Sequence, residues 1–256
     1  MTVCGCKGIR SCILCEQSDR VRSVKSECLP QPVEKFQLFC VHCNTALSCP
    51  HVMNNSSEVD LQGLRVYLDF ISEDEELQLT EDIDKGEWLF SQSGRFKQDY
   101  GPRANYKRKK LKLDKFEGLP KYSQYIRDRL AEIGELKDFI PVEQCNLDYK
   151  PELGSSIDFH FDDFWLWGER LIIINMLSDT HMLFKNEEKY IKVPMLRRSL
   201  LIISGESRFL WKHAIAREDI QSRRISVTFR ELSEKFLTGE RAHEGLKIVE
   251  LASVLV

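Results

Sequence analysis

The sequence lacks an apolar run long enough to cross a bilayer, and polar residues stand at its N-terminus where a signal peptide would need an apolar stretch. It also lacks a strong excess of either charge, because its net charge is −3 and its isoelectric point is about 6.1. A near-neutral chain is not drawn to polyanions as a whole, so contact with nucleic acid would have to come from a local patch. We therefore expect a protein inside the cell with no membrane partner.

Histidine is scarce, with six residues among 256, whereas cysteine is frequent, with nine. The mass of 29.9 kDa, with 42% hydrophobic and 30% charged residues, is that of a chain able to bury a core. Length and composition predict one catalytic domain with a small appendage. Inside the cell the cysteines are expected to be thiols or metal ligands rather than disulfides.

One of the few histidines belongs to an H-x-D motif in a segment that is typical of a β-strand. Successive side chains of a strand point to opposite faces, so His160 and Asp162 are expected on one face. His213, in the alternating segment RFLWKHAI, offers a second imidazole. Two histidines and one carboxylate form the facial set that binds non-haem Fe(II) and leaves positions open for oxygen chemistry. The alternative is an accidental pair of polar residues at a strand end.

Two arginines follow the second histidine. In the segment RISVTFREL, alternation places Arg224 and Arg230 on the same strand face. Their Cα atoms are expected to lie roughly 20 Å apart. From there both guanidinium groups can reach opposite ends of a short dicarboxylate through charged hydrogen bonds. A solvated strand face is the alternative.

The ordered set of H-x-D, His and R-x5-R resembles the AlkB family of Fe(II)- and 2-oxoglutarate-dependent dioxygenases, over about residues 64–231. Five segments look closer still to one animal subgroup of that family, the homolog 4 proteins: CGCKGIRSCILCE, SQSGRFKQDYGP, EQCNLDYKPE, DDFWLWGERL and RRISVTFREL. The resemblance implies an α+β, mainly β fold. It would have a double-stranded β-helix (jelly roll) core, flanking helices and a small Cys-rich N-terminal segment. Short strands with turn signals between them, from Val142 onward, favour the same fold.

The resemblance also implies a ligand set. Fe(II) would be bound by His160, Asp162 and His213, which leaves three coordination positions for 2-oxoglutarate and O2. Arg224 and Arg230 match the two family arginines that each bind one carboxylate of 2-oxoglutarate.

Tyr149 matches a family tyrosine that helps with the distal carboxylate of the cosubstrate. The family pattern N-x-Y is replaced here by Asn146-Leu-Asp-Tyr149. Alternation puts Asn146 on the face opposite Tyr149 unless the strand carries a bulge. Tyr149 is therefore retained as a cosubstrate residue, and Asn146 ranks below it.

Eight of the nine cysteines lie within residues 1–57. The spacing C-x-C-x5-C-x2-C is close enough to enclose one tetrahedral zinc ion, with the ligands Cys4, Cys6, Cys12 and Cys15. A second candidate zinc site combines Cys40 and Cys43 with Cys49 or His51. Alternatively, the two C-x2-C pairs share one ion as a zinc ribbon, or all of these residues are reduced surface thiols.

The residue pattern and the resemblance together imply four regions along the chain. They are a Cys-rich, zinc-binding N-terminal segment (1–57), an N-terminal extension with a substrate-recognition lid (58–140), the double-stranded β-helix catalytic core (141–234) and a C-terminal helix (235–256). Residues 52–63 are typical of a linker. Ser72-x-x-Glu75 predicts a capping box that opens a helix, and residues 123–133 predict a helix with an apolar stripe.

Residues 95–115 carry nine basic residues against two acidic ones, with aromatic residues between them. By analogy with the family, this stretch belongs to the lid. Positive charge with aromatics suits a phosphate backbone with stacked bases or an acidic protein surface. A solvated hairpin whose lysines guard its edge is the alternative. Four residues are candidates for substrate contact. Arg95 and Tyr100 lie in the basic stretch, and Asp163 and Trp165 follow the H-x-D pair. For Trp165, core packing is the alternative.

The resemblance implies oxidative N-demethylation that uses Fe(II), 2-oxoglutarate and O2. Within the homolog 4 subgroup it implies monomethyl-lysine on a protein as the substrate, with actin the expected target, and N6-methyladenine in DNA as the second substrate. It also implies the cytoplasm and nucleus as locations. Two other classes stay open. One is an interaction protein that docks to cytoskeletal or chromatin proteins, and the other is a module that binds single-stranded nucleic acid through residues 95–116.

Overall fold

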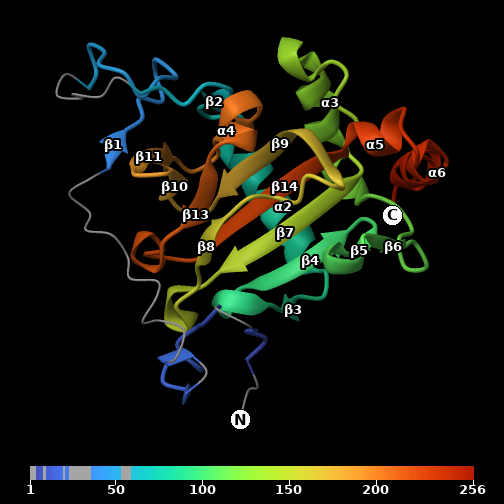
Figure 1. Cartoon of the computed structure of the whole chain (residues 1–256), viewed down its shortest axis with the longest axis horizontal. Coiled ribbons are helices and arrows are strands. Elements are labelled where there is room, and N and C mark those ends of the chain that lie inside the picture. The colour runs from blue at the N-terminus through green and yellow to red at the C-terminus, as the bar shows by residue number, and fades with distance from the viewer. Residues whose placement is uncertain (1–3, 8–9, 20, 23–35, 53–58) are drawn as a thin grey trace.

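The computed structural model describes residues 4–7, 10–19, 21–22, 36–52 and 59–256, and two β-sheets form its centre (Figure 1). The larger sheet has the order β2-β12-β9-β14-β7-β4-β3. Its strands are β2 (Leu64–Tyr67), β12 (Leu200–Ile203), β9 (Trp167–Met176), β14 (Arg224–Leu232), β7 (Glu143–Tyr149), β4 (Phe96–Tyr100) and β3 (Leu89–Phe90). All of its pairings are antiparallel.

The smaller sheet has the order β1-β11-β10-β13-β8. Its strands are β1 (Gln37–Leu38), β11 (Lys189–Met195), β10 (Thr180–Asn186), β13 (Lys212–Ile215) and β8 (Ile157–His160). Only β1 pairs in parallel, with β11. A separate hairpin is formed by β5 (Arg103–Asn105) and β6 (Lys110–Lys112).

Strands β7 to β14 cross between the two sheets as the chain advances. β7, β9, β12 and β14 lie in the larger sheet, whereas β8, β10, β11 and β13 lie in the smaller one. This arrangement is a double-stranded β-helix, and it confirms the predicted fold class, with helices beside the sheets and a Cys-rich segment at the N-terminus.

Alternation along the larger sheet divides the core into two apolar clusters. Ile173 and Tyr149 face the space between the sheets, where they pack with Phe184 and Val193 of the smaller sheet. Ile172 and Val227 point to the opposite face, where they pack against helices. Strands that are buried on both faces have nearly continuous apolar sequences, and the segment RLIIINML is an example.

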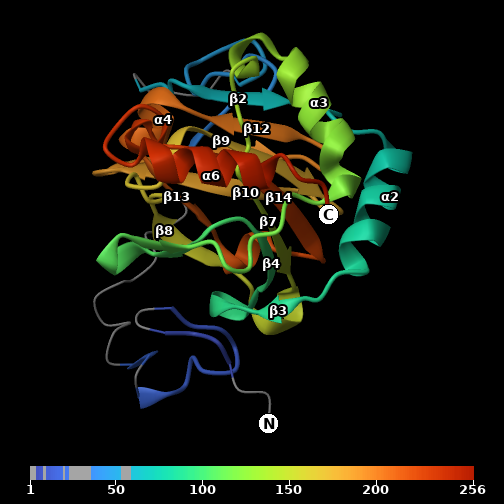
Figure 2. The same cartoon turned by 90° about the vertical axis from the view of Figure 1, so that its right-hand side faces the viewer.

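Two helices cover that outer face of the larger sheet (Figure 2). They are α2 (Glu73–Asp84) and α3 (Gln124–Glu132). The predicted capping box is confirmed, because the Ser72 side chain accepts from the Glu75 amide and the Glu75 carboxylate accepts from the Ser72 amide. The predicted helix over residues 123–133 is confirmed as α3 with one residue fewer at each end.

The C-terminal part packs α6 (Ala242–Ala252) against α5 (Glu234–Leu237) and a third apolar cluster. The contact is so close that a Cβ at Gly245 would lie 1.8 Å from the carbonyl oxygen of Phe236. The remaining short elements are α4 (Gly205–Phe209), η2 (Gln92–Gly94), η3 (Tyr106–Arg108), η4 (Lys121–Ser123), η5 (Gly134–Leu136), η6 (Pro151–Leu153) and η7 (Arg217–Asp219).

Two local expectations differ from the structure. The segment RFLWKHAI is a strand only in its second half, because α4 extends through Phe209 before β13 begins at Lys212. β8 ends at His160, so Asp162 follows the strand rather than lying within it. Much of the predicted linker, residues 53–58, lies outside the described residues.

The limits of the four predicted regions stay predictions. β1 of the first region and β2 to β4 of the second region are strands of the two central sheets. Among the described residues, no helix is both long and apolar enough to span a membrane.

Candidate functional site

The structure brings the H-x-D pair and the second histidine together at one end of the smaller sheet. His160 on β8 and His213 on β13 are register partners, and their ring centroids are 4.3 Å apart. Asp162, two residues after His160, turns back so that Oδ2 lies 3.3 Å from His213 Nε2 and 3.9 Å from His160 Nε2. The three ligand atoms all lie within 4.8 Å of one another, a group that could hold one metal ion.

Hydrogen bonding of His160 through Nδ1 leaves its Nε2 atom available to bind a metal ion. Nδ1 lies 2.8 Å from the carbonyl oxygen of Asp158, to which an Nδ1–H donates, and this directs Nε2 to the other ligands. Burial, together with the neighbouring His213, lowers the pKa of His160 to about 3. The imidazole is therefore neutral at ordinary pH, which is the form that binds a metal.

A partly buried arginine orients the carboxylate of the group. Arg230 donates to Asp162 Oδ1 from both Nε (2.8 Å) and Nη2 (2.7 Å), and from Nη1 it donates to Glu143. Burial opposes the charged form of Asp162, but Arg230 above all, with His213, outweighs it and holds the pKa of this carboxyl well below its usual range. Asp162 thus presents one oxygen to the arginine and the other to the imidazoles.

The other predicted arginine lies deep between the sheets. Arg224 is 1% exposed, its Nε donates to Asn175 Oδ1 at 2.6 Å, and its guanidinium lies 4.7 Å from the ring centroid of Tyr149. Its Nη1 has no hydrogen-bond partner within the described part of the chain. Burial lowers the pKa of Arg224, with Tyr149 partly offsetting the effect. Burying a guanidinium whose N–H makes no hydrogen bond costs folding free energy, unless a bound anion accepts that hydrogen bond.

Arg95, predicted as a substrate residue within the basic stretch, is buried rather than part of a surface patch. It is 4% exposed, its Nε donates to the carbonyl of Gln92, and its guanidinium lies 5.7 Å from the ring centroid of Tyr149. Tyr149 therefore has two guanidinium groups near its ring. This concentrates positive charge in the interior beside His160, Asp162 and His213, which we call the His160 group.

The residues present fit the two groups that the H-x-D and arginine patterns imply. Two imidazole nitrogens and one carboxylate oxygen are the donor set of a non-haem Fe(II) site. The unpaired Nη1 of Arg224, enclosed between the sheets, suits one end of a small dicarboxylate such as 2-oxoglutarate.

Two predicted residues do not reach this interior. The pairing of β7 with β14 runs without a bulge, so Asn146 faces the side opposite Tyr149. Its amide donates to Gln98 and to the Tyr122 hydroxyl, at 2.9 and 3.0 Å, on the helix-covered side of the sheet. Tyr100 pairs with Gln144 on that same side. Neither residue has support as a cosubstrate or substrate contact.

The two candidates after the H-x-D pair have structural partners. The Asp163 carboxylate accepts from the amide of Trp165 at 2.8 Å, which fixes the turn into β9. Trp165 is 8% exposed and packs edge-on against Phe236, with ring centroids 5.5 Å apart. The core alternative therefore describes Trp165 better than substrate contact does.

Sequence patterns missed several residues that shape the site. Arg208 on α4 is 2% exposed and donates to the main-chain oxygens of Asp162 and Gly168, so it holds the loop that carries the carboxylate. Asn175 orients Arg224. A polar residue inside the apolar run LIIINM was the signal that could have identified Asn175, whereas Arg208 left no comparable signal.

The β5–β6 hairpin also contributes Tyr106, which the sequence offered only as one of several aromatic residues in the basic stretch. Tyr106 in η3, between β5 and β6, keeps 44% of its surface exposed. Burial of its hydroxyl, and then the charge of Glu143, raises the pKa of Tyr106, and Trp167 and Arg230 also interact with it. The hydroxyl thus lies near the Arg230–Glu143 pair and Asp162.

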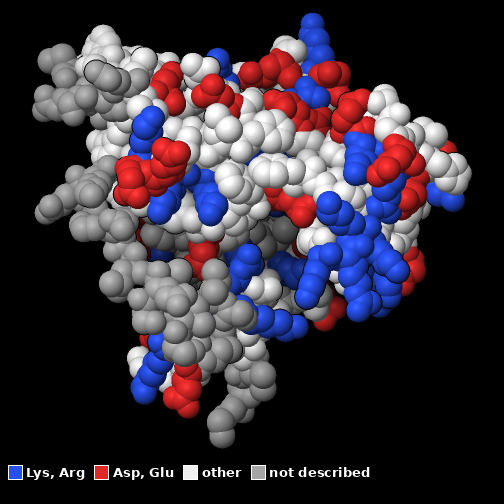
Figure 3. Space-filling model, in the orientation of Figure 1, with Lys and Arg blue, Asp and Glu red and all other residues white. Residues whose placement is uncertain are grey.

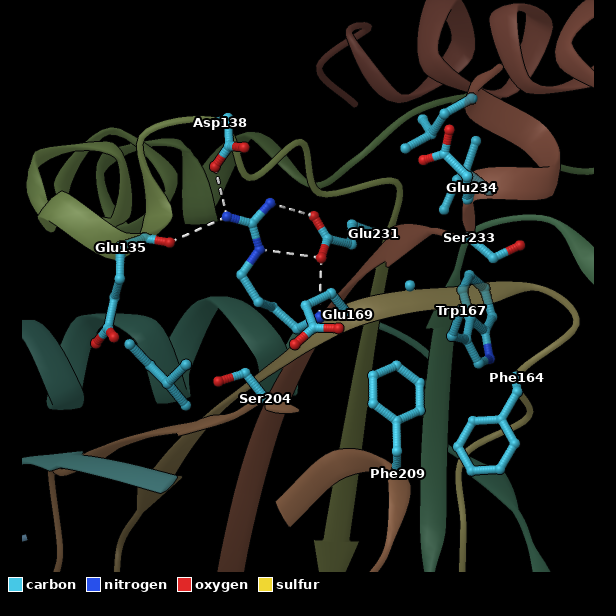
Figure 4. Close-up of a pocket in the computed structure, with 15 residues that line it drawn as sticks. Glu135, Asp138, Phe164, Trp167, Glu169, Ser204, Phe209, Glu231, Ser233 and Glu234 are labelled. Atoms are coloured by element: carbon cyan, nitrogen blue, oxygen red, sulfur yellow. Dashed lines mark hydrogen bonds and ion pairs between the residues drawn. The ribbon is translucent and has the colours of Figure 1, made fainter. Parts of the chain in front are cut away.

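A separate cavity of about 710 Å³ is lined in part by Trp167 (Figure 4). Phe164, Phe209 and Trp167 stand at one end of it. At the other end Glu231 and Asp138 bind the guanidinium of Arg170, at 2.7 and 2.5 Å. None of the three residues of the His160 group lines this cavity. We regard the interior between the sheets, and not this cavity, as the reactive site.

The cysteines form two groups rather than one ribbon. Cys4, Cys6, Cys12 and Cys15 place their sulfur atoms within 4.8 Å of one another, as do the ligand atoms of Cys40, Cys43, Cys49 and His51. The alternative that joins Cys12/Cys15 with Cys40/Cys43 is therefore wrong. The first group docks beside the core, because Cys6 Sγ accepts from the amide of Ser93 at 3.1 Å.

No protein-family model matches the chain. Among curated proteins, the chain is 38% identical to the human alpha-ketoglutarate-dependent dioxygenase alkB homolog 4, over 97% of this chain and 93% of that protein. It is 34% identical to a Caenorhabditis elegans protein named DNA N6-methyl adenine demethylase, over 99% of this chain and 95% of that protein. The solved structure of OsALKBH1 aligns with 66% of this chain and 98% of that chain, at 13% identity and a TM-score of 0.48.

The likeness to the human and nematode proteins extends over almost the whole chain, including the Cys-rich N-terminal segment. It therefore covers the double-stranded β-helix, the His160 group and the buried arginines together. The chain belongs to the alkB homolog 4 family of alpha-ketoglutarate-dependent dioxygenases.

Proposed function

We propose that the chain is an N-demethylase whose iron is bound by His160, Asp162 and His213. The observation that carries this proposal is their convergence, within 4.8 Å, from two paired strands and the loop after one of them. A facial donor set of this kind leaves half of an octahedral coordination sphere open. When bound, iron and 2-oxoglutarate supply the activation of O2 that hydroxylates a methyl carbon.

The cosubstrate carboxylates would be held by the buried Arg224 and the partly buried Arg230. Arg224 offers its unpaired Nη1, and the Tyr149 hydroxyl offers a further donor, to the distal carboxylate. Arg230 uses three of its five N–H bonds on Asp162 and Glu143. The other two suit the carboxylate nearer the iron. Arg230 thus keeps Asp162 ionised and oriented while it binds one end of the cosubstrate.

For the substrate we propose monomethyl-lysine on a protein, with actin as the expected target. The support comes from the family and from the lid. The lid hairpin β5–β6 carries Lys and Arg side chains over its exposed surface (Figure 3), which suits an acidic protein surface. Tyr106 on the same hairpin interacts with Glu143, Arg230 and Asp162, so a segment bound by the hairpin would lie near the proposed iron ligands.

N6-methyladenine in DNA is the second candidate substrate. The specific observation in its favour is the nematode relative, which is named DNA N6-methyl adenine demethylase. The basic hairpin also suits phosphate groups, and the exposed ring of Tyr106 suits a stacked base.

A substrate panel separates the two candidates. The full chain is loaded with Fe(II) and 2-oxoglutarate without oxygen, and the absorption of the complex is recorded. Oxygen is then admitted with a monomethyl-lysine peptide, a peptide with unmodified lysine, or DNA that contains N6-methyladenine. We expect formaldehyde and succinate in equal amounts from the methylated peptide alone, and none with His160→Ala. Formaldehyde from DNA instead would establish the second candidate, and no formaldehyde from either would refute demethylation.

The first cysteine group is proposed as a structural zinc site. Cys4, Cys6, Cys12 and Cys15 supply four sulfur ligands, the set of a closed structural site. This group also lies beside the core, since the amide of Ile13 donates to Leu153 at 3.3 Å. A zinc ion there would fix the N-terminal segment in a form that can bind cytoskeletal or chromatin proteins. The cytoplasm and nucleus stay the predicted locations.

A further inference from the structure

The second group of metal ligands lies far from the iron site, in the loop that follows β1. Cys40, Cys43, Cys49 and His51 place three sulfur atoms and one nitrogen within 4.8 Å of one another. Cys43 Sγ already lies 3.3 Å from His51 Nδ1. Ligand atoms on a tetrahedral zinc ion are separated by roughly 3.3–3.8 Å, given zinc–ligand bonds of about 2.0–2.3 Å. The four donors therefore need to move only slightly to close around one ion.

Two tight turns present these donors in pairs. Cys40 bridges Thr45, with their amides and carbonyls 2.8 and 3.3 Å apart, and Asn44 between them adopts φ = 49°. Asparagine tolerates this left-handed conformation better than most residues, which lets the chain reverse directly after Cys43. The second turn is closed by the amide of Val52, which donates to the carbonyl of Cys49 at 3.0 Å. Cys-x2-Cys and Cys-x-His thus face each other from opposite turns.

The same loop joins the edges of the two sheets. On one side, β1 pairs with β11, the neighbouring strand of the smaller sheet. On the other side, the Asn44 side chain accepts from the Val66 amide of β2 at 2.6 Å, and β2 is the edge strand of the larger sheet. Phe39, Val41 and Ala46 point inward and belong to the apolar cluster between the sheets. The loop is therefore a plug on the β1–β2 side of the core.

We propose that Cys40, Cys43, Cys49 and His51 bind a zinc ion that clamps this plug across the two sheet edges. Three thiolates and one imidazole fill all four positions of a tetrahedral site, so the site is structural and offers no position to a substrate. β11 and β10 lie between β1 and the strands that carry the iron ligands. Loss of the clamp is thus expected to weaken the fold without removing the iron site.

The test counts zinc in the full chain and in matched variants. All variants carry Asp162→Ala, so that zinc cannot occupy the His160 group. Cys43→Ser with Cys49→Ser is expected to lose one zinc per chain and to lower the melting temperature by several degrees. The control is His42→Ala, because His42 is exposed and its ring centroid lies 5.2 Å from that of His51, yet it is outside the ligand group. This control is expected to keep its zinc.

Two results would overturn the proposal. One is an unchanged zinc content in the Cys43→Ser, Cys49→Ser variant, and the other is equal loss of zinc in His42→Ala and His51→Ala. X-ray absorption of zinc in the chain with only Asp162→Ala gives a reading that does not depend on the cysteine variants folding. With both cysteine groups filled, seven sulfur ligands and one nitrogen ligand are expected for two ions, and no nitrogen would exclude His51.

Discussion

Two groups of metal ligands are assembled in opposite ways. One is the His160 group, and the other, the Cys40 group, consists of Cys40, Cys43, Cys49 and His51. The ligands of the first come from β8, the loop after it and β13, with four strands of chain between His160 and His213. Those of the second come from one loop of two turns within residues 40–51. The first uses nitrogen and oxygen and stands beside unpaired cationic N–H, whereas the second uses mainly sulfur. A reactive centre depends on the whole fold, and a structural clamp depends on local turns.

The largest expected effect is the loss of 2-oxoglutarate turnover when the His160 group alone is disrupted. Asp162→Ala removes the only carboxylate ligand and leaves Arg230 with Glu143 as its remaining anionic partner. Because loss even of the groups that orient a ligand costs about 10–100-fold, we expect turnover of 2-oxoglutarate to fall at least about 100-fold. Succinate formation under saturating Fe(II) measures it. The zinc bound by the two cysteine groups should not change, and retention of more than a tenth of the activity would contradict the ligand assignment.

A smaller effect is expected for the cosubstrate arginine. Arg224→Gln removes charged hydrogen bonds worth about 1.5–3 kcal/mol, so the KM for 2-oxoglutarate should rise roughly 10–100-fold. The matched control is Arg223→Gln, because Arg223 points to the opposite face and pairs with Asp84 and Asp148. Steady-state kinetics at varied 2-oxoglutarate compares the two. Equal KM values for both variants would remove the role proposed for Arg224.

A change in the C-terminal region should affect stability and neither metal group. Gly245→Ala places a Cβ 1.8 Å from the Phe236 carbonyl oxygen, so α6 must shift away from α5. Overpacking of this kind costs about 1–3 kcal/mol of the free energy of unfolding. Gly134→Ala is the control, because a Cβ there meets nothing within 4 Å. Denaturant unfolding measures the difference, and a similar loss in both variants would show that the α5–α6 contact is loose.

The smallest effect is expected at the surface, at the start of α2. Arg129 and the Ser72 amide lower the pKa of Glu75, so its ionisation stabilises the fold above the ordinary carboxyl range. The pair is partly exposed, and Glu75→Gln should cost less than about 1 kcal/mol at neutral pH. The gap between wild type and variant should shrink as the pH falls through the lowered pKa. A gap that widens in acid would reverse the sign of this argument.

Much of the site followed from local sequence patterns. Strand alternation correctly separated Asn146 from Tyr149, because β7 carries no bulge. It also placed Arg224 and Arg230 on one face, which in the structure is the face between the sheets. The capping box at Ser72 and the paired spacing of the cysteines were equally local and could be identified without a fold.

Other features could not be derived from the sequence. Arg95 looked like part of a basic surface but is buried against Tyr149, because the pairing of β4 with β7 carries it to the edge of the interior. Arg208 and Asn175 act on Asp162 and Arg224 from elements more than forty residues away along the chain. The choice between Cys49 and His51 was open in the sequence, and the turns bring both to the same point.

The sequence by itself determined which side chains share a strand face, where α2 begins and which cysteines are spaced for metal binding, because these depend on periods of a few residues. Only the tertiary structure decided that His160 meets His213, that Arg230 grips Asp162, and that the Cys40 loop spans two sheet edges. Each of those contacts joins segments whose proximity is set by the pairing order of the sheets. That order is a property of the packed core and not of any one segment.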